Sequence, residues 1–278
     1  MEENRTVSTI PLKVMSFNIA HGMGMDNRVD LERIAYIIEQ SGTEVIGLQE
    51  LDRYFDERSS FIDQVEWLSK RLGMYAAFGA NLDFEPLEAE RPRRQYGNAV
   101  FSKYPIKYVE NHLLTEVESP FAPSEQRGIL EAVIEVDGTY LSFYNTHLSL
   151  KEEQLQLNVD EILAIMDKSQ FPKVLTGDFN ANPEQPQLNR FRNALNDVFA
   201  DVEEGKSFTY PAPHQDGIDG VMLKPITRID YIWTDLPMPP KQASVIETSA
   251  SDHLPIVAEL VLASVAKPTK SAAGMRNQ

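Results

Sequence analysis

The stretch ILEAVIEVDGTYLSFYNTH, from Ile129 to His147, decides the class of fold that we expect for this chain. It contains two apolar runs, Ile129–Val136 and Tyr140–Asn145, that have the composition of buried β-strands. Asp137-Gly138 lies between them, and this dipeptide favours the tight type I′ turn of an antiparallel hairpin. An antiparallel hairpin argues against a doubly wound, all-parallel sheet.

Strand-like and helix-like segments alternate on both sides of this hairpin. Apolar residues at helical spacing predict helices around residues 31–42, 61–73 and 154–166. Short apolar runs predict further strands at residues 12–17, 44–48, 98–102, 106–114, 173–175, 228–233, 243–247 and 256–262. Hairpins placed between helices indicate an α/β protein with two mostly antiparallel sheets, packed face to face and flanked by helices.

The composition is that of a packed, acidic protein. The 278 residues include 26 Lys and Arg against 42 Asp and Glu, which gives a formal net charge of −16. We expect one domain at residues 11–265, between a flexible N-terminus (residues 1–10) and a flexible C-terminal tail (residues 266–278). The sequence shows no secretion signal and no transmembrane segment, so we expect a cytoplasmic protein. We infer no obligate protein partner.

The chain contains no cysteine, which excludes disulfides, thiolate zinc sites and iron–sulfur clusters. Any metal must be bound by oxygen or imidazole ligands, which favour Mg²⁺ or Mn²⁺, with Ca²⁺ as a further candidate. The negative charge argues against tight binding to duplex DNA, because phosphate contacts come from Lys and Arg. An anionic substrate is still compatible with this charge if a bound divalent cation supplies positive charge.

Polar residues that are poor strand formers follow the predicted strands repeatedly. They are Asn18, Glu50, Asn145, His147, Asp178, Asn180, Asp230, Asp252 and His253. Taken alone, Asn18 or Asp178 could serve a turn, Glu50 could be a solvated acid, and His147 could be structural. Loops at one end of a sheet can, however, bring distant segments together. Because the pattern recurs at separate strand ends, we favour one common site.

These side chains provide what the metal-assisted hydrolysis of a phosphoester requires. Carboxylate and amide oxygens bind a hard divalent cation, which neutralises the charge that develops on phosphoryl oxygens. An Asp–His pair orients an imidazole, and an Asp beside an Asn can position a water molecule. The pattern therefore favours an enzyme that hydrolyses phosphoester bonds.

Seven segments resemble, in order, the motifs of the endonuclease/exonuclease/phosphatase superfamily. They are SFNIAHG (residues 16–22), IGLQELD (46–52), YGNAVFSKYPI (96–106), NTHLS (145–149), TGDFNANP (176–183), RIDYIW (228–233) and SDHLPI (251–256). This superfamily includes pancreatic-type deoxyribonuclease, apurinic endonucleases, neutral sphingomyelinases and inositol polyphosphate phosphatases. The chain looks like a bacterial, uncharacterised branch of it. The resemblance implies a four-layer α/β sandwich and a divalent-metal-dependent hydrolase.

The resemblance implies a metal site made by Asn18, Glu50 and Asp252, with Glu50 as the central ligand. Some apurinic endonucleases carry an acidic residue two positions after the first Asn, where this chain has Ala20. Their second metal arrangement is therefore not carried over. His21 follows in the same segment, and two interpretations remain open for it: it faces the site, or it faces solvent.

The resemblance also implies catalytic roles. Asp178 would hold or deprotonate the attacking water, and Asn180 would contact the scissile phosphate. His253 would act at the phosphate and be oriented by Asp230. His147 would stabilise the phosphate or the leaving group.

Three residues are candidates for substrate binding: Asn145, Arg127, and Arg94 in a long predicted loop at residues 81–95. Two alternatives stay open at equal weight: Arg127 is a packing contact, and the loop that carries Arg94 is a solvated surface loop. A second insertion, residues 207–225, offers Tyr210 for specificity. We predict hydrolysis of a phosphodiester by metal-activated attack of water on phosphorus, with nucleic acid among the candidate substrates. The alternative is a phospholipid or phosphoinositol head group, although no apolar hairpin or basic surface is obvious in the sequence. A catalytically inactive binding protein on the same fold is a third, less favoured hypothesis.

Overall fold

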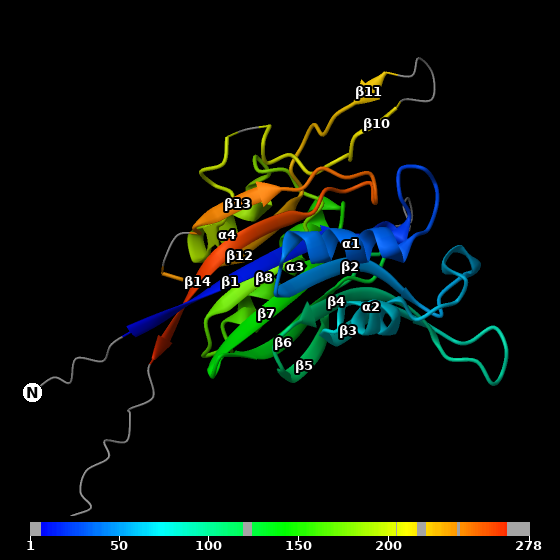
Figure 1. Cartoon of the computed structure of the whole chain (residues 1–278), viewed down its shortest axis with the longest axis horizontal. Helices are drawn as coiled ribbons and strands as arrows, with labels where there is room; N and C mark the ends of the chain where they lie inside the picture. The colour runs from blue at the N-terminus through cyan, green and yellow to red at the C-terminus, as the bar shows by residue number, and fades with distance from the viewer. Residues whose placement is uncertain (1–6, 119–123, 204, 216–220, 238–239, 266–278) are drawn as a thin grey trace, which may run out of the picture.

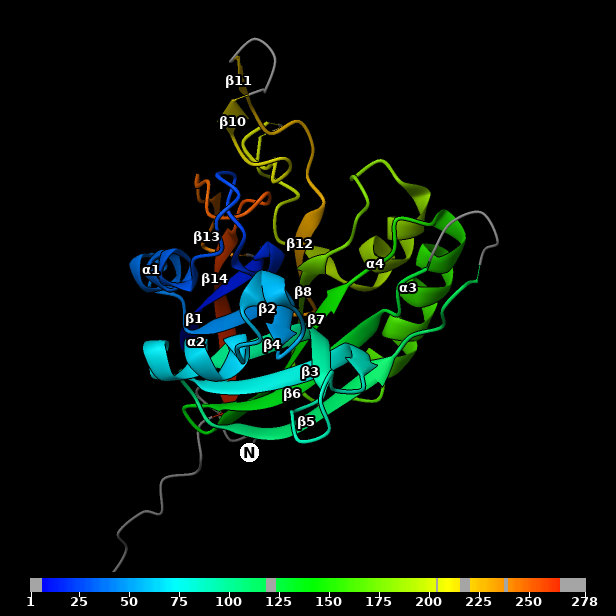
Figure 2. The same cartoon turned by 90° about the vertical axis from the view of Figure 1, so that its right-hand side faces the viewer.

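The computed structural model describes residues 7–118, 124–203, 205–215, 221–237 and 240–265. Two six-stranded sheets pack face to face, and helices cover the outer side of each sheet (Figures 1 and 2). The first sheet has the strand order β13-β14-β1-β2-β4-β3 and the second the order β5-β6-β7-β8-β12-β9. This arrangement confirms the predicted α/β sandwich. No helix in the described part of the chain is long and apolar enough to cross a membrane.

The first sheet is built from β1 (Val7–Asn18), β2 (Val45–Arg53), β3 (Tyr75–Phe84), β4 (Arg94–Ser102), β13 (Gln242–Val245) and β14 (Ile256–Val265). The second is built from β5 (Ile106–Leu113), β6 (Gly128–Val136), β7 (Thr139–His147), β8 (Lys173–Asp178), β9 (Asn196–Asp197) and β12 (Asp230–Thr234). β10 (His214–Gln215) and β11 (Met222–Leu223) form a separate two-stranded arm. The α-helices are α1 (Leu31–Ser41), α2 (Gln64–Leu72), α3 (Glu152–Met166) and α4 (Asn189–Ala194).

Each six-stranded sheet contains one parallel pair, β1 with β2 and β7 with β8, and its other pairs are antiparallel. Parallel strands end at the same edge of a sheet. Asn18 at the end of β1 therefore lies beside Gln49, and His147 at the end of β7 pairs with Asp178 at the end of β8. The polar strand ends of both sheets are thus collected at one edge of the sandwich.

The hairpin turn and the end of α1 form as the sequence predicts. Asp137 and Gly138 have φ values of 47° and 82°, the positive values that a type I′ turn requires at both positions. Asp30 caps α1 by accepting from the backbone N–H of Glu32 at 3.0 Å, and Gly42 ends this helix in the left-handed conformation. These local signals fix where the helix begins and ends.

The apolar core has three layers. One cluster fills the space between the sheets and includes Val14, Val100, Phe143 and Ile232. A second cluster joins α1 and α2 to the first sheet, and a third joins α3 and α4 to the second sheet. Burial of apolar side chains stabilises the fold by roughly 25 cal/mol per Å², so these clusters hold the strand ends in fixed positions.

Two expected boundaries were wrong. Residues 81–95 are not one loop, because β3 continues to Phe84 and β4 begins at Arg94. β3 has a small-residue run with Gly79, where an added Cβ would lie 2.3 Å from Asn111 Oδ1, and such a run lacks the apolar alternation of a recognisable strand. The domain also begins earlier than residue 11, because residues 7–10 pair with β14. Residues 1–6 and 266–278 of the expected flexible ends lie outside the described residues.

Candidate active site

Asp178, the last residue of β8, lies at the centre of the converging strand ends. Asn18 from the other sheet donates from Nδ2 to Asp178 Oδ2 at 3.0 Å and to Glu50 Oε1 at 2.9 Å. The Nε2 atoms of two histidines lie near the same oxygen, 3.4 Å away for His147 and 3.6 Å away for His253. The structure therefore brings these five predicted site residues together.

Glu50 is positioned by an irregularity in β2. The register of β2 against β4 shifts between Leu48 and Leu51, and Glu50 itself has a φ of 64°. A bulge re-aims a side chain, and a left-handed conformation costs a residue other than glycine about 1–3 kcal/mol. Burial raises the pKa of Glu50, although the hydrogen bond from Asn18 acts to lower it. The nearby charge of Asp252 raises this pKa further. The backbone therefore holds a strained, poorly solvated carboxylate at the edge of the sandwich.

His253 and Asp230 form a buried pair. His253 Nδ1 lies 3.0 Å from Asp230 Oδ2, and the side chain of Asp230 is fully buried. This contact places a proton on Nδ1 and leaves Nε2 directed at Asp178. Burial alone would lower the pKa of His253, but the charges of Asp230 and Asp178 outweigh it and raise the pKa to about 10. The imidazole is therefore a cation at neutral pH in the metal-free protein.

Asn180 connects Asp178 to His147. Its backbone N–H donates to Asp178 Oδ1 at 2.9 Å, and its side-chain Nδ2 lies 3.1 Å from His147 Nε2. Asn180 has a φ of 50°, a conformation that Asn accepts more readily than most residues. Burial raises the pKa of Asp178, although the charge of His253 opposes this shift. Asp178 is thus a carboxylate that binds a proton more readily than a solvated aspartate.

His147 is in a different state from His253. The amide nitrogen of Asn180 can only donate, so Nε2 of His147 accepts and its proton lies on Nδ1, 4.0 Å from Glu50 Oε1. Burial lowers the pKa of His147 well below its usual value, and the charge of Arg127 acts in the same direction. The site therefore combines one neutral and one charged imidazole, which is the arrangement expected where two groups have different roles.

A hard divalent cation fits the donor groups of this site. Asp178, Asp230 and His253 each bring one ligand atom within 4.8 Å of the others, but the hydrogen bond of His253 to Asp230 already uses two of these atoms. Glu50 is a better ligand, because its Oε2 has no hydrogen bond to a described residue and its side chain is 24% exposed. Asp252 lies close enough for its charge to act on Glu50. Two acids with unshared oxygens are typical of a magnesium or manganese site.

Asn18 is placed to position these carboxylates. Its Oδ1 accepts from the backbone N–H of Ala20 at 3.0 Å, so its NH₂ group faces Glu50 and Asp178. As a metal ligand it would contribute Oδ1 only after the amide group flipped, so that Oδ1 and Nδ2 exchanged places. The structure therefore brings Asn18 to the predicted place with its nitrogen toward the carboxylates.

Asn145 does not reach a substrate surface, contrary to our expectation. It is fully buried between the two sheets. Its Nδ2 donates to the carbonyl oxygens of Leu48 at 2.7 Å and Ala99 at 2.9 Å, and its Oδ1 accepts from Gln49 at 2.6 Å and Thr176 at 3.2 Å. These four bonds use all the donors and acceptors of the amide. Asn145 is thus a clamp between the sheets beneath the site.

We expect Asn145→Ala to lower the free energy of unfolding by about 3 kcal/mol or more, because buried carbonyls and an amide lose their partners at about 1–3 kcal/mol each. Urea denaturation would measure the loss. The turnover of the fraction that stays folded should remain within a few-fold of the unsubstituted protein. Asn189→Ala on the exposed surface of α4 is the control and should change stability little. Equal stability of both variants would contradict the clamp.

The two candidate arginines lie in different places. Arg127 is 8% exposed, pairs with Glu125 at 2.6 Å, and has a buried Nε without a hydrogen bond to the described residues. Its charge acts on His147, which is consistent with the predicted place near the site. Arg94 was expected to bind the substrate, but it instead donates to Glu85 O at 3.1 Å and lines a separate pocket of about 230 Å³.

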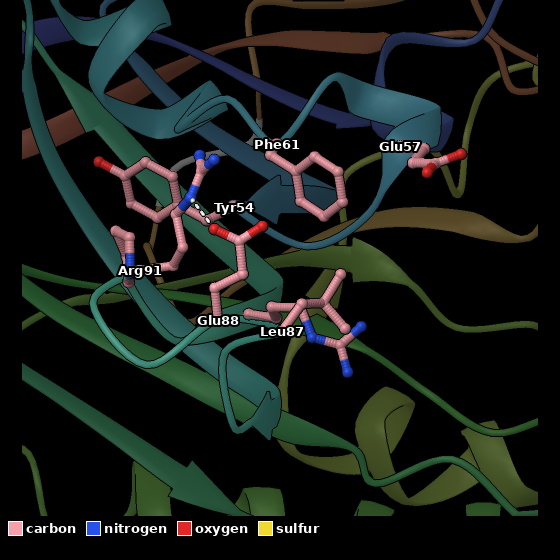
Figure 3. A pocket seen from close by; sticks show the side chains of 8 residues that line it. Tyr54, Glu57, Phe61, Leu87, Glu88 and Arg91 are labelled. Carbon is pink, nitrogen blue, oxygen red and sulfur yellow. Dashed lines mark hydrogen bonds and ion pairs between the residues drawn. The ribbon is translucent and has the colours of Figure 1, made fainter.

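This pocket lies between the loop after β2 and the loop before β4. Figure 3 shows the side chains of Tyr54, Phe61 and Leu87 around it, with an ion pair between Arg91 and Glu88 at 3.3 Å. None of the residues that line it belongs to the Asp178 centre. The structure therefore does not bring Arg94 to the carboxylates. Arg94 lies at the same end of the sheet, past the Arg53–Gln95 pair, but its side chain is directed to Glu85 and the separate pocket.

Two residues near the site, Arg58 and Tyr96, carried little or no signal in the sequence, whereas a third, Tyr210, was expected to contribute to specificity. Arg58, in the loop after β2, pairs with Asp52 at 2.7 Å and feels the charge of Glu50. Tyr96 is buried, and the charge of Glu50 contributes to raising its pKa. Only the place of Tyr96 at the start of the YGNAVFSKYPI segment could have indicated this residue. Tyr210, from the second insertion, packs against His253 with ring centroids 4.9 Å apart.

Comparisons with known proteins agree with this geometry. A model of the Endonuclease/Exonuclease/phosphatase family matches residues 15–253. The uncharacterized protein YbhP of Escherichia coli strain K12 is 23% identical over an aligned length of 273, and the alignment covers 90% of this chain and 96% of YbhP. The crystal structure of an endonuclease/exonuclease/phosphatase from Beutenbergia cavernae has a TM-score of 0.71 and 26% identity, over 92% of this chain and 72% of that one.

The mannosyl-6-phosphatase Bt3783 of Bacteroides thetaiotaomicron shares the fold, with a TM-score of 0.68 and 19% identity over 90% of this chain and 99% of that one. The motif order, the two-sheet sandwich and the family match lead to one conclusion. The chain belongs to the endonuclease/exonuclease/phosphatase family.

Proposed function

We propose that this protein is a divalent-metal-dependent phosphodiesterase, with single-stranded or small phosphodiesters as its substrates. One observation carries the proposal. Glu50, Asp178 and the His253–Asp230 pair come from four separate strand ends, and contacts of 2.9–3.6 Å connect them into one centre. The net charge of −16 argues against a duplex-binding nuclease, because no basic excess offsets the repulsion of the DNA.

The residues of the centre divide the work of hydrolysis between them. Asp178 would accept the proton of the attacking water while the water oxygen forms its bond to phosphorus. The ester oxygen would leave with the electron pair of the broken P–O bond and take up a proton from the solvent. His253, protonated because of Asp230, would donate a hydrogen bond to the phosphoryl oxygens. Asn180 and the neutral His147 would hold the phosphate from the other side.

Glu50 and Asp252 would hold the divalent cation, together with Asn18 if its side-chain amide flipped. When bound, the cation would neutralise the charge that develops on the phosphoryl oxygens and the leaving group. Mg²⁺ and Mn²⁺ suit these oxygen ligands, and Ca²⁺ is a further candidate. The rise in the pKa of Glu50 supports this assignment, since a buried carboxylate gains most from a nearby cation.

A phospholipid or phosphoinositol head group is the second candidate substrate, and one structural feature favours it. The arm that carries β10 and β11 projects from the body of the protein, as Figures 1 and 2 show. Met222 and Ile226 on this arm are 54% and 73% exposed. The same segment contains Tyr210, which packs on His253. An exposed apolar hairpin beside the site is a feature that was not obvious in the sequence.

A panel of substrates tests both candidates. We expect hydrolysis of bis(p-nitrophenyl) phosphate and of single-stranded oligonucleotides with Mg²⁺ or Mn²⁺, and its complete loss with a chelator. Phospholipid vesicles form the second arm. Asp178→Asn should lower the rate by about two orders of magnitude or more, because the general base is lost. The expected metal effect on stability is a rise in melting temperature with Mg²⁺, because the cation binds only the folded protein.

The same panel contains the outcomes that reject the proposal. Hydrolysis that persists in the chelator, or that is equally fast in Asp178→Asn, would remove the metal-assisted scheme. Hydrolysis of the phospholipid vesicles and of no other substrate would replace the first candidate substrate, a small or single-stranded phosphodiester, by the second, a lipid head group. Binding of Mg²⁺ without turnover of any phosphoester would favour the inactive binding protein.

A further inference from the structure

The loop after β2 contains a cationic side chain, Arg58, that the scheme above does not use. Arg58 donates from Nε and Nη2 to the two oxygens of Asp52, at 2.9 Å and 2.7 Å, and Asp52 is fully buried. The guanidinium also lies over two rings, 4.8 Å from the centre of Phe55 and 5.4 Å from that of Tyr96. Three side chains, Asp52, Phe55 and Tyr96, thus hold Arg58 in one orientation, so it would lose little freedom on binding a ligand.

One nitrogen of this guanidinium, Nη1, is left over from the contact with Asp52. The Nη1 atom makes no hydrogen bond to any residue that the structure describes, and the side chain is 36% exposed. Burial has the largest effect on the pKa of Arg58 and of Tyr96, but the charge of Glu50 also acts on both. Arg58 therefore offers hydrogen-bond donors close to Glu50, because its partner Asp52 follows Glu50 by two residues in β2.

The ring of His21, three residues after Asn18, makes no hydrogen bond to a described residue. Both of its ring nitrogens are buried. Burial lowers the pKa of His21, and the charge of Arg58 lowers it further, so the ring is neutral and has one donor and one acceptor. Buried polar atoms in native proteins are nearly always paired, so an unpaired imidazole in this place requires an explanation.

The backbone holds His21 in this place at some cost. Ala20 and His21 have φ values of 43° and 46°, a conformation that residues other than glycine rarely adopt. Gln64 holds the turn, because its Nε2 donates to His21 O at 2.7 Å while its Oε1 accepts from the N–H of Asp52 at 2.9 Å. The same buried amide therefore links His21 to the strand that carries Asp52 and Glu50. Strain that is kept in place by such contacts is typical of functional positions.

We propose that Arg58 and His21 form a binding subsite for a phosphate oxygen of the substrate, beside Glu50. This subsite rests on the proposed function and extends it, because it assigns two residues that hold the substrate rather than the cation. The ligand is an oxyanion because Arg58 offers only donors, and the neutral His21 can add a donor of its own. The oxygen belongs either to the scissile phosphate or to a neighbouring phosphate of the same substrate.

The first experiment measures binding without turnover. Inorganic phosphate and thymidine 3′,5′-bisphosphate are titrated into the metal-free protein by calorimetry. We expect Arg58→Lys and His21→Asn each to weaken binding by roughly ten- to a hundred-fold, the usual effect of losing a charge-assisted hydrogen bond. Lys cannot form the two-bond contact with Asp52. Asn accepts the left-handed backbone at position 21, so that change removes the ring and keeps the turn.

A second arginine in the same segment provides the matched control. Arg53 also pairs with an aspartate, Asp63, at 2.8 Å, and also lies over a ring, 5.1 Å from the centre of Phe78. It contacts no residue of the proposed subsite. Arg53→Lys should therefore bind phosphate as the unsubstituted protein does. If Arg58→Lys fails to fold because Asp52 loses its partner, His21→Asn still tests the proposal.

The second experiment identifies the phosphate. The p-nitrophenyl ester of thymidine 5′-phosphate is compared with the same ester carrying an additional 3′-phosphate. An equal rise in KM for both esters in Arg58→Lys supports contact with the scissile phosphate. A rise only for the ester with two phosphates supports contact with the neighbouring one. Unchanged phosphate affinity and unchanged KM for both esters in the two folded variants overturn the subsite. Absence of turnover in the unsubstituted protein would count against the proposed function, while the calorimetry would still decide the subsite.

Discussion

Glu50→Gln is expected to reduce metal-dependent hydrolysis by about three orders of magnitude or more in kcat/KM while the protein stays folded. The substitution removes a negative charge and almost no volume. A bound cation contributes several kcal/mol to transition-state stabilisation, and each 1.36 kcal/mol is about tenfold in rate. Glu50 is the acid of the centre with a free, partly exposed oxygen, so we expect no neighbouring acid to replace it.

The stability of this variant should change in the opposite direction to its activity. Burial raises the pKa of Glu50 in the folded state, so the ionised side chain destabilises the metal-free protein. A raised carboxyl pKa means that the folded state binds the proton more tightly, so stability is lost as the pH rises above the unfolded value. Gln carries no charge, and Glu50→Gln should therefore be at least as stable as the unsubstituted protein at pH 8 without metal.

Thermal denaturation with and without Mg²⁺ separates the two effects. The unsubstituted protein should gain melting temperature with Mg²⁺, and Glu50→Gln should not. Glu66→Gln is the control, because Glu66 lies on the exposed surface of α2, paired with Lys70, and should keep both activity and the metal effect. An active Glu50→Gln enzyme with an unchanged response to Mg²⁺ would remove Glu50 from the metal site.

The local signals of the sequence predicted those parts of the fold that neighbouring residues decide. The Asp137-Gly138 turn and the glycine that ends α1 act within a few residues, so they could be located without a structure. β3 could not, because its strand character comes from pairing along β4 and not from an apolar pattern of its own. The order of strands in each sheet likewise depends on contacts between distant segments.

The sequence predicted which strand ends form the candidate site, but it did not predict how deeply each side chain is buried. Asn145 and His147 lie on the same side of β7, two residues apart, which is roughly 7 Å along a strand. That distance places His147 at the edge and Asn145 between the sheets, where four bonds use its amide. Arg58 was beyond prediction for another reason, and for His21 the sequence left two orientations open. Their two segments are joined by Gln64, which donates to His21 O and accepts from the N–H of Asp52, and such a link between distant segments leaves no local signal.

His253→Ala and Asp230→Asn are each expected to lower kcat by about two to four orders of magnitude, the usual range for a general acid–base group and its orienting carboxylate. Asp230 fixes the proton on Nδ1 through the 3.0 Å contact and directs Nε2 toward the centre. Asn in its place keeps the volume, but it offers a weaker, uncharged partner. The two residues act as one unit, so the double variant should be about as slow as His253→Ala alone.

The pH dependence of Asp230→Asn distinguishes loss of charge from loss of packing. Burial would lower the pKa of His253 from its ordinary 6.5, and the charges of Asp230 and Asp178 raise it to about 10. A group whose folded pKa is raised keeps its proton below that pKa and loses it as the pH rises. Removal of the Asp230 charge should therefore move the alkaline limb of the kcat profile to lower pH. A bound cation lowers the pKa in both proteins, so the direction of the difference is preserved.

The control is Tyr231→Phe, which changes the next residue of β12, whose hydroxyl donates to Ala181 O at 2.8 Å. This change loosens the same strand without touching the imidazole, so it should leave the pH profile in place. If Asp230→Asn acted only by disturbing β12, both variants would lose a similar factor in kcat and neither alkaline limb would move. That result would reduce Asp230 to a packing residue. A shift to lower pH in Asp230→Asn alone, absent from His253→Ala, requires the carboxylate to act through the imidazole.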